Sequence, residues 1–142
     1  MKSTILALFL LAAGSTVSFA QCDKKVNLIA SKTEYLDTNG IVERTEAEQT
    51  VIDISKSDIT VIADNGNQKM TGAIKSNTCD WKVPYKEGKM TITTTLSSEN
   101  GDQKDFTITI EGKDGKVFLF AESKQMPDKK LRLTLDKFEE KN

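Results

Sequence analysis

The sequence predicts an all-β protein, an eight-stranded antiparallel up-and-down barrel or flattened barrel that forms a single domain. Two observations support this prediction: turn motifs recur at regular intervals along the 142-residue chain, and the segments between them alternate apolar and polar residues. Alternation with a period of two is typical of a strand that buries one face. Short turns join neighbouring antiparallel strands into a meander, and closing the meander into a barrel removes both exposed edges.

Seven turn motifs divide the chain after its first twenty residues, and the last of them is Met126-Pro127-Asp128. Three motifs contain Asn-Gly and one contains Asp-Gly, pairs that favour tight hairpin turns because both residues tolerate a positive φ. The strands predicted between the turns lie near residues 25–36, 41–54, 58–63, 68–83, 89–98, 104–111, 116–125 and 130–138.

One predicted strand changes its buried face part of the way along. In segment 68–83, Met70 and Ile74 occupy even positions, whereas Cys79 and Trp81 occupy odd ones. A strand changes face only where an extra residue is inserted. We therefore expect a β-bulge or a break near Lys75–Thr78.

The first twenty residues have the pattern of an export signal. Lys2 precedes an apolar run from Ile5 to Ala13, and Ser18-Phe19-Ala20 places small residues before a cleavage point. The run is shorter than the ~20 residues that a membrane-spanning helix needs. We expect a signal peptide at residues 1–20, a barrel domain at residues 21–142, and a periplasmic or secreted mature protein without a transmembrane span.

Two cysteines, Cys22 and Cys79, remain in the mature chain. Cysteines of an exported protein usually pair, so we expect a disulfide between the start of the domain and its middle. The alternatives are a redox-active thiol and a lipid anchor at Cys22. Against them, the sequence has no C-x-x-C motif or His to lower a thiol pKa. Gln21 also stands where bacterial lipoproteins carry a small residue.

Composition restricts the chemistry that the chain can perform. The 20 Lys+Arg and 21 Asp+Glu give a net charge of −1, so there is no basic surface for nucleic acid. The sequence contains no His, the commonest general base and metal ligand. Motifs for zinc, calcium and phosphate binding are absent as well. We therefore expect no metal site and no cofactor.

Carboxylates are the residues that remain for catalysis. Glu43, Glu46 and Glu48 cluster around Arg44, and Asp80 stands beside Trp81. A glycosidase would need two carboxylates in a cleft, one of them with a raised pKa. No apolar sequence surrounds these residues, so we expect solvated side chains and no enzyme activity. Residues 43–49 are rich in helix formers, and a short helix is the alternative to a strand there.

The predicted inward face favours a binding protein. Its residues are mainly Ile, Leu and Met, which form either a solid core or the wall of an apolar pocket, and an eight-stranded barrel allows both. We place the opening of such a pocket near Trp81 and Tyr85. The predicted ligand-binding residues are Met70, Ile74, Trp81, Tyr85, Met90, Ile92, Phe106, Ile108 and Leu119. The first hypothesis is a non-catalytic carrier of an apolar small molecule.

Two phenylalanines support an alternative function. The segment from Val117 to Ala121 is apolar on both faces, so Phe118 and Phe120 would lie outside a barrel. Either another segment covers these rings or they form a patch that binds a protein partner. The alternative hypothesis is therefore a protein-interaction module, such as an inhibitor or an envelope partner. A carboxylate-based hydrolase is the third.

Two segments carry a resemblance to known proteins. The block Thr78-Cys79-Asp80-Trp81-Lys82-Val83-Pro84-Tyr85-Lys86-Glu87-Gly88-Lys89 and the ending Met126-Pro127-Asp128-Lys129-Lys130-Leu131 resemble small uncharacterised exported β-barrel proteins of Bacteroidota. The strand count and meander also resemble lipocalin-like barrels, which implies a ligand inside the barrel. The early G-x-W element of lipocalins is absent, because the only Trp lies in the middle of the chain.

Overall fold

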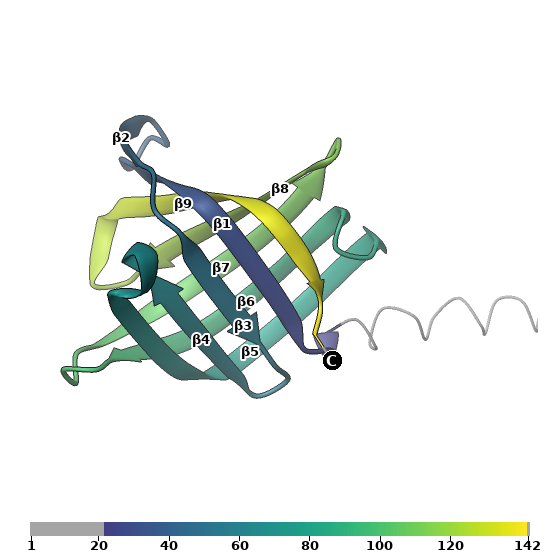
Figure 1. The fold of residues 1–142 in the computed structure, drawn as a ribbon, viewed down its shortest axis with the longest axis horizontal. Helices are drawn as coiled ribbons and strands as arrows, with labels where there is room; N and C mark the ends of the chain where they lie inside the picture. Colours follow the sequence, from purple (N-terminus) through teal and green to yellow (C-terminus); the bar gives the residue numbers. More distant parts are fainter. Residues whose placement is uncertain (1–21, 142) are drawn as a thin grey trace, which may run out of the picture.

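The computed structural model describes residues 22–141 and shows an antiparallel barrel of eight strands with one additional strand (Figure 1). The predicted fold class is thus confirmed, and the predicted signal peptide lies outside the described residues. Within residues 22–141, no helix is long and apolar enough to cross a membrane. The strands are β1 (Val26–Leu36), β2 (Val42–Glu46), β3 (Thr50–Ile54), β4 (Asp58–Ala63), β5 (Gln68–Val83), β6 (Glu87–Ser98), β7 (Gln103–Lys113), β8 (Lys116–Ser123) and β9 (Met126–Glu140), and a short 3₁₀ turn, η1 (Asp64–Gly66), joins β4 to β5.

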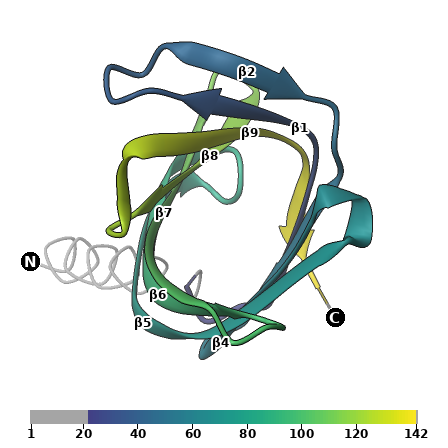
Figure 2. The same cartoon turned by 90° about the vertical axis from the view of Figure 1, so that its left-hand side faces the viewer.

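The first and last strands close the barrel. β1 pairs with β9 from Val26 opposite Glu140 to Leu36 opposite Lys130, along the whole of β1. The other wall strands follow the chain order from β3 to β9, each antiparallel to its neighbour. Figure 2 looks along the barrel and shows these strands surrounding a common interior, with the β1–β2 hairpin along one side.

The predicted strand at 41–54 is wrong as a single strand, because β2 and β3 are separate. The first half of β1 pairs with β3, and its second half pairs with β2, on either side of an irregularity between Ala30 and Thr33. Residues 47–49 have no regular structure, and the alternative of a helix over 43–49 is also wrong. At the break, the Gln49 N–H donates to Asn65 Oδ1 at 2.7 Å, and the Asn65 N–H donates to the Gln49 carbonyl at 3.2 Å. These bonds tie the break to η1, so only β3 continues into the barrel wall.

The predicted last turn lies two residues too late. β8 ends at Ser123 and β9 begins at Met126, so residues 124–125 form the turn. Pairing then shifts register between Ser123–Met126 and Glu122–Lys130, which places Pro127 in the irregular part of the ladder. A proline is tolerated there because it has no N–H to donate. The sequence motif therefore marks a bulge beside the turn.

The predicted bulge in β5 is confirmed. Ile74 lies opposite Thr94 of β6 and Ser76 lies opposite Thr93, so Lys75 is an extra residue in the β5 strand. After the bulge, β5 turns its odd-numbered residues inward. This change of face brings the aromatic residue at the end of β5 into the barrel.

The predicted disulfide is present between Cys22 and Cys79, with their Cα atoms 5.8 Å apart. It attaches the segment before β1 to β5, close to the end of that strand at Val83.

The disulfide should contribute strongly to stability. Its two cysteines are 57 residues apart, and closing a loop of that size is worth about 4 kcal/mol in the chain-entropy model. Replacing both cysteines by Ser should lower the free energy of unfolding by about 2–4 kcal/mol in urea denaturation. Reducing the unaltered protein should give a similar loss. An unchanged free energy of unfolding in both experiments would contradict this role.

An aromatic cluster closes one end of the barrel, which we call the closed end. The Trp81 side chain is only 6% exposed, and its ring centroid lies 5.6 Å from Phe138 and 6.5 Å from Tyr85. Gly88, with φ +138°, lets the β5–β6 turn approach this ring, since a Cβ there would lie 2.7 Å from Trp81 Cα. Behind the cluster lie the fully buried aliphatic side chains of Leu28, Ile54, Ile59, Ile92 and Ile110.

Trp81 should be the most sensitive position of the closed end. Trp81→Ala would leave a cavity among rings and should lower the free energy of unfolding by about 3–5 kcal/mol. Among residues 22–141 the buried Trp81 indole N–H has no hydrogen-bond partner. Trp81→Phe keeps a ring and removes that unpaired donor, so it should cost under about 2 kcal/mol. Equal losses for the two variants, measured in urea, would show that the ring does not hold this end together.

Candidate functional site

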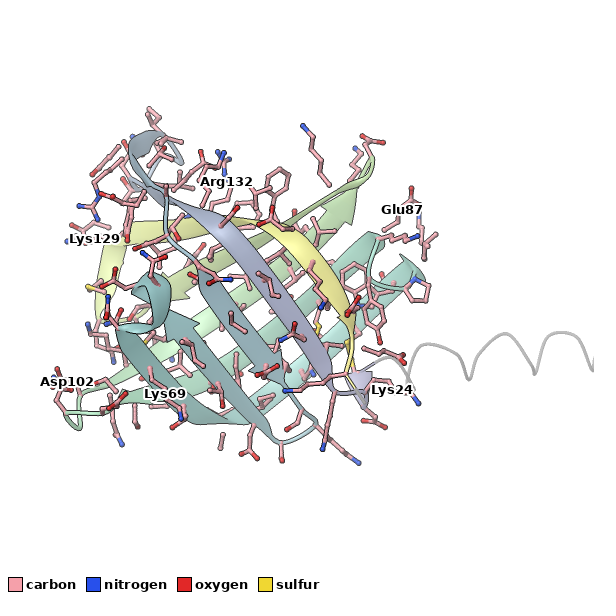
Figure 3. All side chains as sticks on the ribbon, viewed as in Figure 1. Lys24, Lys69, Glu87, Asp102, Lys129 and Arg132 are labelled. Carbon is pink, nitrogen blue, oxygen red and sulfur yellow. A yellow bond between two sulfur atoms is a disulfide. The ribbon has the colours of Figure 1, made fainter. Side chains whose placement is uncertain are left out.

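A cavity of about 450 Å³ occupies the other half of the barrel. Its end of the barrel, which we call the open end, carries the β1–β2 hairpin, η1, and the turns β6–β7 and β8–β9. Figure 3 labels Lys69, Asp102 and Lys129 at this end and Lys24 and Glu87 at the closed end. The apolar residues of the cavity wall are Ile52, Val61, Ala63, Met70, Leu96, Phe106, Ile108, Leu119, Ala121, Leu131 and Leu133.

The size of the inward side chains explains why this half is hollow. At the open end, the inward positions include small residues, Ala63, Ala121, Thr33 and Thr50, on four different strands. At the closed end, the corresponding positions carry Ile, Leu, Met and the Trp81 ring, which fill the interior. The barrel is therefore solid at one end and hollow at the other. The sequence left open a solid core or an apolar pocket, and each of these describes one half of the barrel.

The structure places the predicted ligand-binding residues in three groups. Those that line the cavity are Met70, Phe106, Ile108 and Leu119. Met90 and Ile92 are buried in the solid half, and Ile74 is partly buried against the core. Trp81 and Tyr85 belong to the closed end. The cavity thus opens at the end opposite to the one we expected, because Trp81 fills the closed end and does not border an entrance.

Polar groups meet at the rim of the cavity. The Tyr35 hydroxyl donates a hydrogen bond of 2.9 Å to Glu48 Oε1. The Arg44 guanidinium lies 4.0 Å from the centroid of the Tyr35 ring, and its Nε is 3.1 Å from Glu46 Oε1. Burial and the hydrogen bond to Glu48 raise the pKa of Tyr35, so its hydroxyl remains a donor at neutral pH.

Sequence reasoning found these rim residues only in part. Glu46, Glu48 and Arg44 appeared as a solvated charge cluster, and Tyr35 did not appear as a site residue. The useful signal is the break in hydrophobic alternation between two apolar strands, since β2 leaves the wall and carries its charges to the rim. Asp80, the other carboxylate that we singled out, is exposed and far from the cavity wall.

Phe118 and Phe120 lie on the outer face of β8, as the alternation predicts, and both are half-buried. Their ring centroids are 6.4 Å apart, and the Arg132 guanidinium lies 5.8 Å from the Phe118 ring. Glu34 fixes Arg132 through two hydrogen bonds, of 3.1 and 2.8 Å. These bonds from Arg132 lower the pKa of Glu34. The patch is therefore partly covered by a charged pair from β1 and β9.

A second carboxylate on the outer surface is also held in its charged form. Asp105 accepts a hydrogen bond from Thr95 Oγ1 at 2.5 Å and others from Gln125 and Lys75, which together lower its pKa to about 2. General acid catalysis by a carboxyl group needs a pKa shift in the opposite direction. Across residues 22–141, no cluster of three His, Cys, Asp or Glu side chains has the geometry to hold a metal ion.

These features define a class of protein: a closed eight-stranded antiparallel barrel with a packed end, a hollow end and a polar rim. Comparison with known proteins adds no relative, since the chain matches no family model, no curated protein and no solved structure.

The two tyrosines, one at each end of the barrel, should titrate abnormally. The Tyr85 hydroxyl donates to Glu140 Oε1 at 2.9 Å, and burial together with this bond raises the pKa of Tyr85 to about 12. Tyr85 should therefore lose its proton near pH 12, and Tyr35, whose pKa is also raised, should lose its proton above the ordinary tyrosine value of ~10. A raised native pKa stabilises the fold below pH ~10, and this contribution disappears as the pH rises through about 12.

The measurement is a spectrophotometric titration of tyrosinate, with circular dichroism recorded at each pH to follow the fold. Tyr85→Phe leaves Tyr35 as the only phenol and should remove the transition near pH 12. A native midpoint equal to that of the urea-unfolded protein would show that neither hydroxyl is held as described.

Proposed function

We propose that this protein binds an apolar small molecule, without catalysis, in the open half of its barrel. The observation that supports this proposal is the cavity of about 450 Å³, which has apolar walls on seven of the eight barrel strands. Pockets for small ligands commonly have volumes of ~300–1,000 Å³ and are mostly apolar, with a few placed polar groups. The wall residues and the Tyr35–Glu48–Arg44 rim fit that description.

Burial of apolar surface would supply the affinity. Each Å² of apolar surface removed from water contributes about 25 cal/mol, less the cost of immobilising the ligand. Met70 and Phe106, in the cavity wall near the open end, are only partly buried. A ligand would therefore cover apolar surface that the barrel itself leaves accessible to water. The rim groups would then fix the orientation of the ligand by hydrogen bonds.

The proposal includes export to the periplasm or to the medium. The Cys22–Cys79 disulfide supports this location, since such bonds persist in oxidising compartments. A carrier in that compartment would exchange its ligand with the surrounding solution through the open end.

The matched variants Ala121→Trp and Glu122→Trp test this proposal. Ala121 points into the cavity and Glu122, its neighbour on β8, is exposed on the outer face. An indole at position 121 should fill much of the empty space and weaken binding of the neutral fluorophore N-phenylnaphthylamine at least tenfold. Glu122→Trp should bind the fluorophore as the unaltered protein does.

Urea denaturation of both variants checks that each is folded. If the unaltered protein shows no saturable fluorescence increase, or if folded Ala121→Trp binds the fluorophore with undiminished affinity, the cavity is not the binding site.

A further inference from the structure

The cavity continues outward into a second space with a different lining. This space, of about 380 Å³, shares seven lining residues with the cavity, so the two are continuous: Tyr35, Arg44, Gln68, Met70, Phe106, Ala121 and Leu131. We call the outer space the vestibule. It lies between the β1–β2 hairpin and the start of β9, at the open end of the barrel.

Positive charge dominates the vestibule. Its cationic residues are Arg44, Lys104, Lys129 and Lys130, and its one acidic residue is Glu43. The lysines come from β7 and β9, and Arg44 comes from β2, so three separate strands bring cations to one small space. Figure 3 shows Lys129 at this end of the molecule. The chain as a whole has a net charge of −1, so this concentration of cations is local.

Two of the four cations have no ion-pair partner among residues 22–141. Arg44 pairs with Glu46, and Lys130 Nζ lies 3.3 Å from Glu122 Oε1. Lys104 and Lys129 take part in no ion pair within that part of the chain. Their ammonium groups are therefore free to meet a charge brought by a ligand.

The carboxylates that line the cavity, unlike these two lysines, mostly have partners. Glu46 is engaged by Arg44, and Glu48 accepts the hydrogen bond of Tyr35. Asp64, in η1, is the remaining carboxylate of the cavity lining. It comes from the turn between β4 and β5, and the vestibule lining does not include it. A ligand that extends from the apolar cavity into the vestibule therefore passes two occupied carboxylates before it reaches two unpaired ammonium groups.

From this arrangement we infer that the ligand is an amphiphile with an anionic head group, a carboxylate or a phosphate monoester on an apolar chain. The chain lies in the cavity between Met70, Phe106 and Leu119, and the head lies in the vestibule beside Lys104 and Lys129. This inference rests on the proposed function and adds the chemical class of the ligand. Ammonium groups attract either anion as point charges, which is why the shared feature is the negative charge.

Four amphiphiles that differ only in the head group test the inference: dodecanoate, dodecyl phosphate, dodecanol and dodecyltrimethylammonium. Each is titrated, below its critical micelle concentration, against the protein loaded with N-phenylnaphthylamine. We expect the two anions to displace the fluorophore at concentrations about three- to tenfold below that of dodecanol, which matches one or two partly exposed ion pairs. The tighter of the two anions then identifies the head group.

Charge-removing variants locate the effect. In the double variant Lys104→Gln/Lys129→Gln, the two anions should no longer bind more tightly than dodecanol, while the affinity for dodecanol stays as in the unaltered protein. The control is Lys113→Gln/Lys116→Gln, which removes two exposed lysines from the β7–β8 turn at the closed end and should leave the advantage unchanged. Raising the ionic strength should reduce the advantage as well, because the Debye length falls from ~30 Å at ~0.01 M to ~10 Å at ~0.1 M salt.

The two proposals fail in different ways. If all four amphiphiles bind equally, or if the cation binds most tightly, the anionic head group is wrong while an apolar carrier remains. If the vestibule variant keeps the preference for anions, the head group does not lie beside Lys104 and Lys129, and the inferred site is wrong. If none of the four displaces the fluorophore and the fluorophore itself does not bind, the proposed function fails, and the inference fails with it.

Discussion

The pairing of β1 with β9 is the constraint on which the rest of this structure depends. It joins the last strand of the sheet back to β1, so that among the described strands only β2, which pairs with β1 alone, keeps a free edge. Along its other side β1 pairs first with β3 and then with β2, and its register against β9 shifts between Ala30 and Thr33, where the partner changes. That shift allows β2 to leave the wall while β3 stays in it. The rim of the cavity, with Arg44 and Glu48, is thus a consequence of how the barrel closes.

Closure alone does not decide whether the interior is filled. The bulge at Lys75 turns the end of β5 so that Trp81 enters the barrel, and Phe138 and Tyr85 pack against it. The disulfide at Cys79, two residues before Trp81, holds the segment before β1 beside this end. At the other end Phe106 and Tyr35 line the cavity without filling it, and the small residues Ala63 and Ala121 face inward. A rigid closed end and a hollow open end follow from these few positions.

The sequence predicted the parts of this arrangement that depend on local patterns. Strand period, turn residues and the change of face in segment 68–83 led to the barrel, the bulge and four residues of the cavity wall, among them Met70 and Phe106. The position of the opening could not be predicted in this way, since it depends on which inward side chains meet across the barrel. Trp81 illustrates the difficulty, because an aromatic residue near a strand end can either border a pocket entrance or pack inside the barrel and close it. The sequence pattern is the same in both cases. The charged segment 43–49 was visible, but its place over the cavity depends on the three-way pairing of β1.

The cavity also relates the fold to the proposed chemistry. The apolar walls of the cavity and the unpaired lysines of the vestibule would give one ligand two different environments along its length. A fully packed barrel of the same strands would offer neither. The division of the interior into a packed half and a binding half is therefore the central claim of this account.

Methyl-resolved NMR during a titration with dodecanoate tests that claim most directly. The account predicts saturable shifts at methyl groups of the cavity wall, such as those of Ile108, Leu119 and Leu133, with little change at Ile92 and Ile110 in the packed half. Shifts confined to the outer surface, or spread evenly over both halves of the barrel, would contradict it.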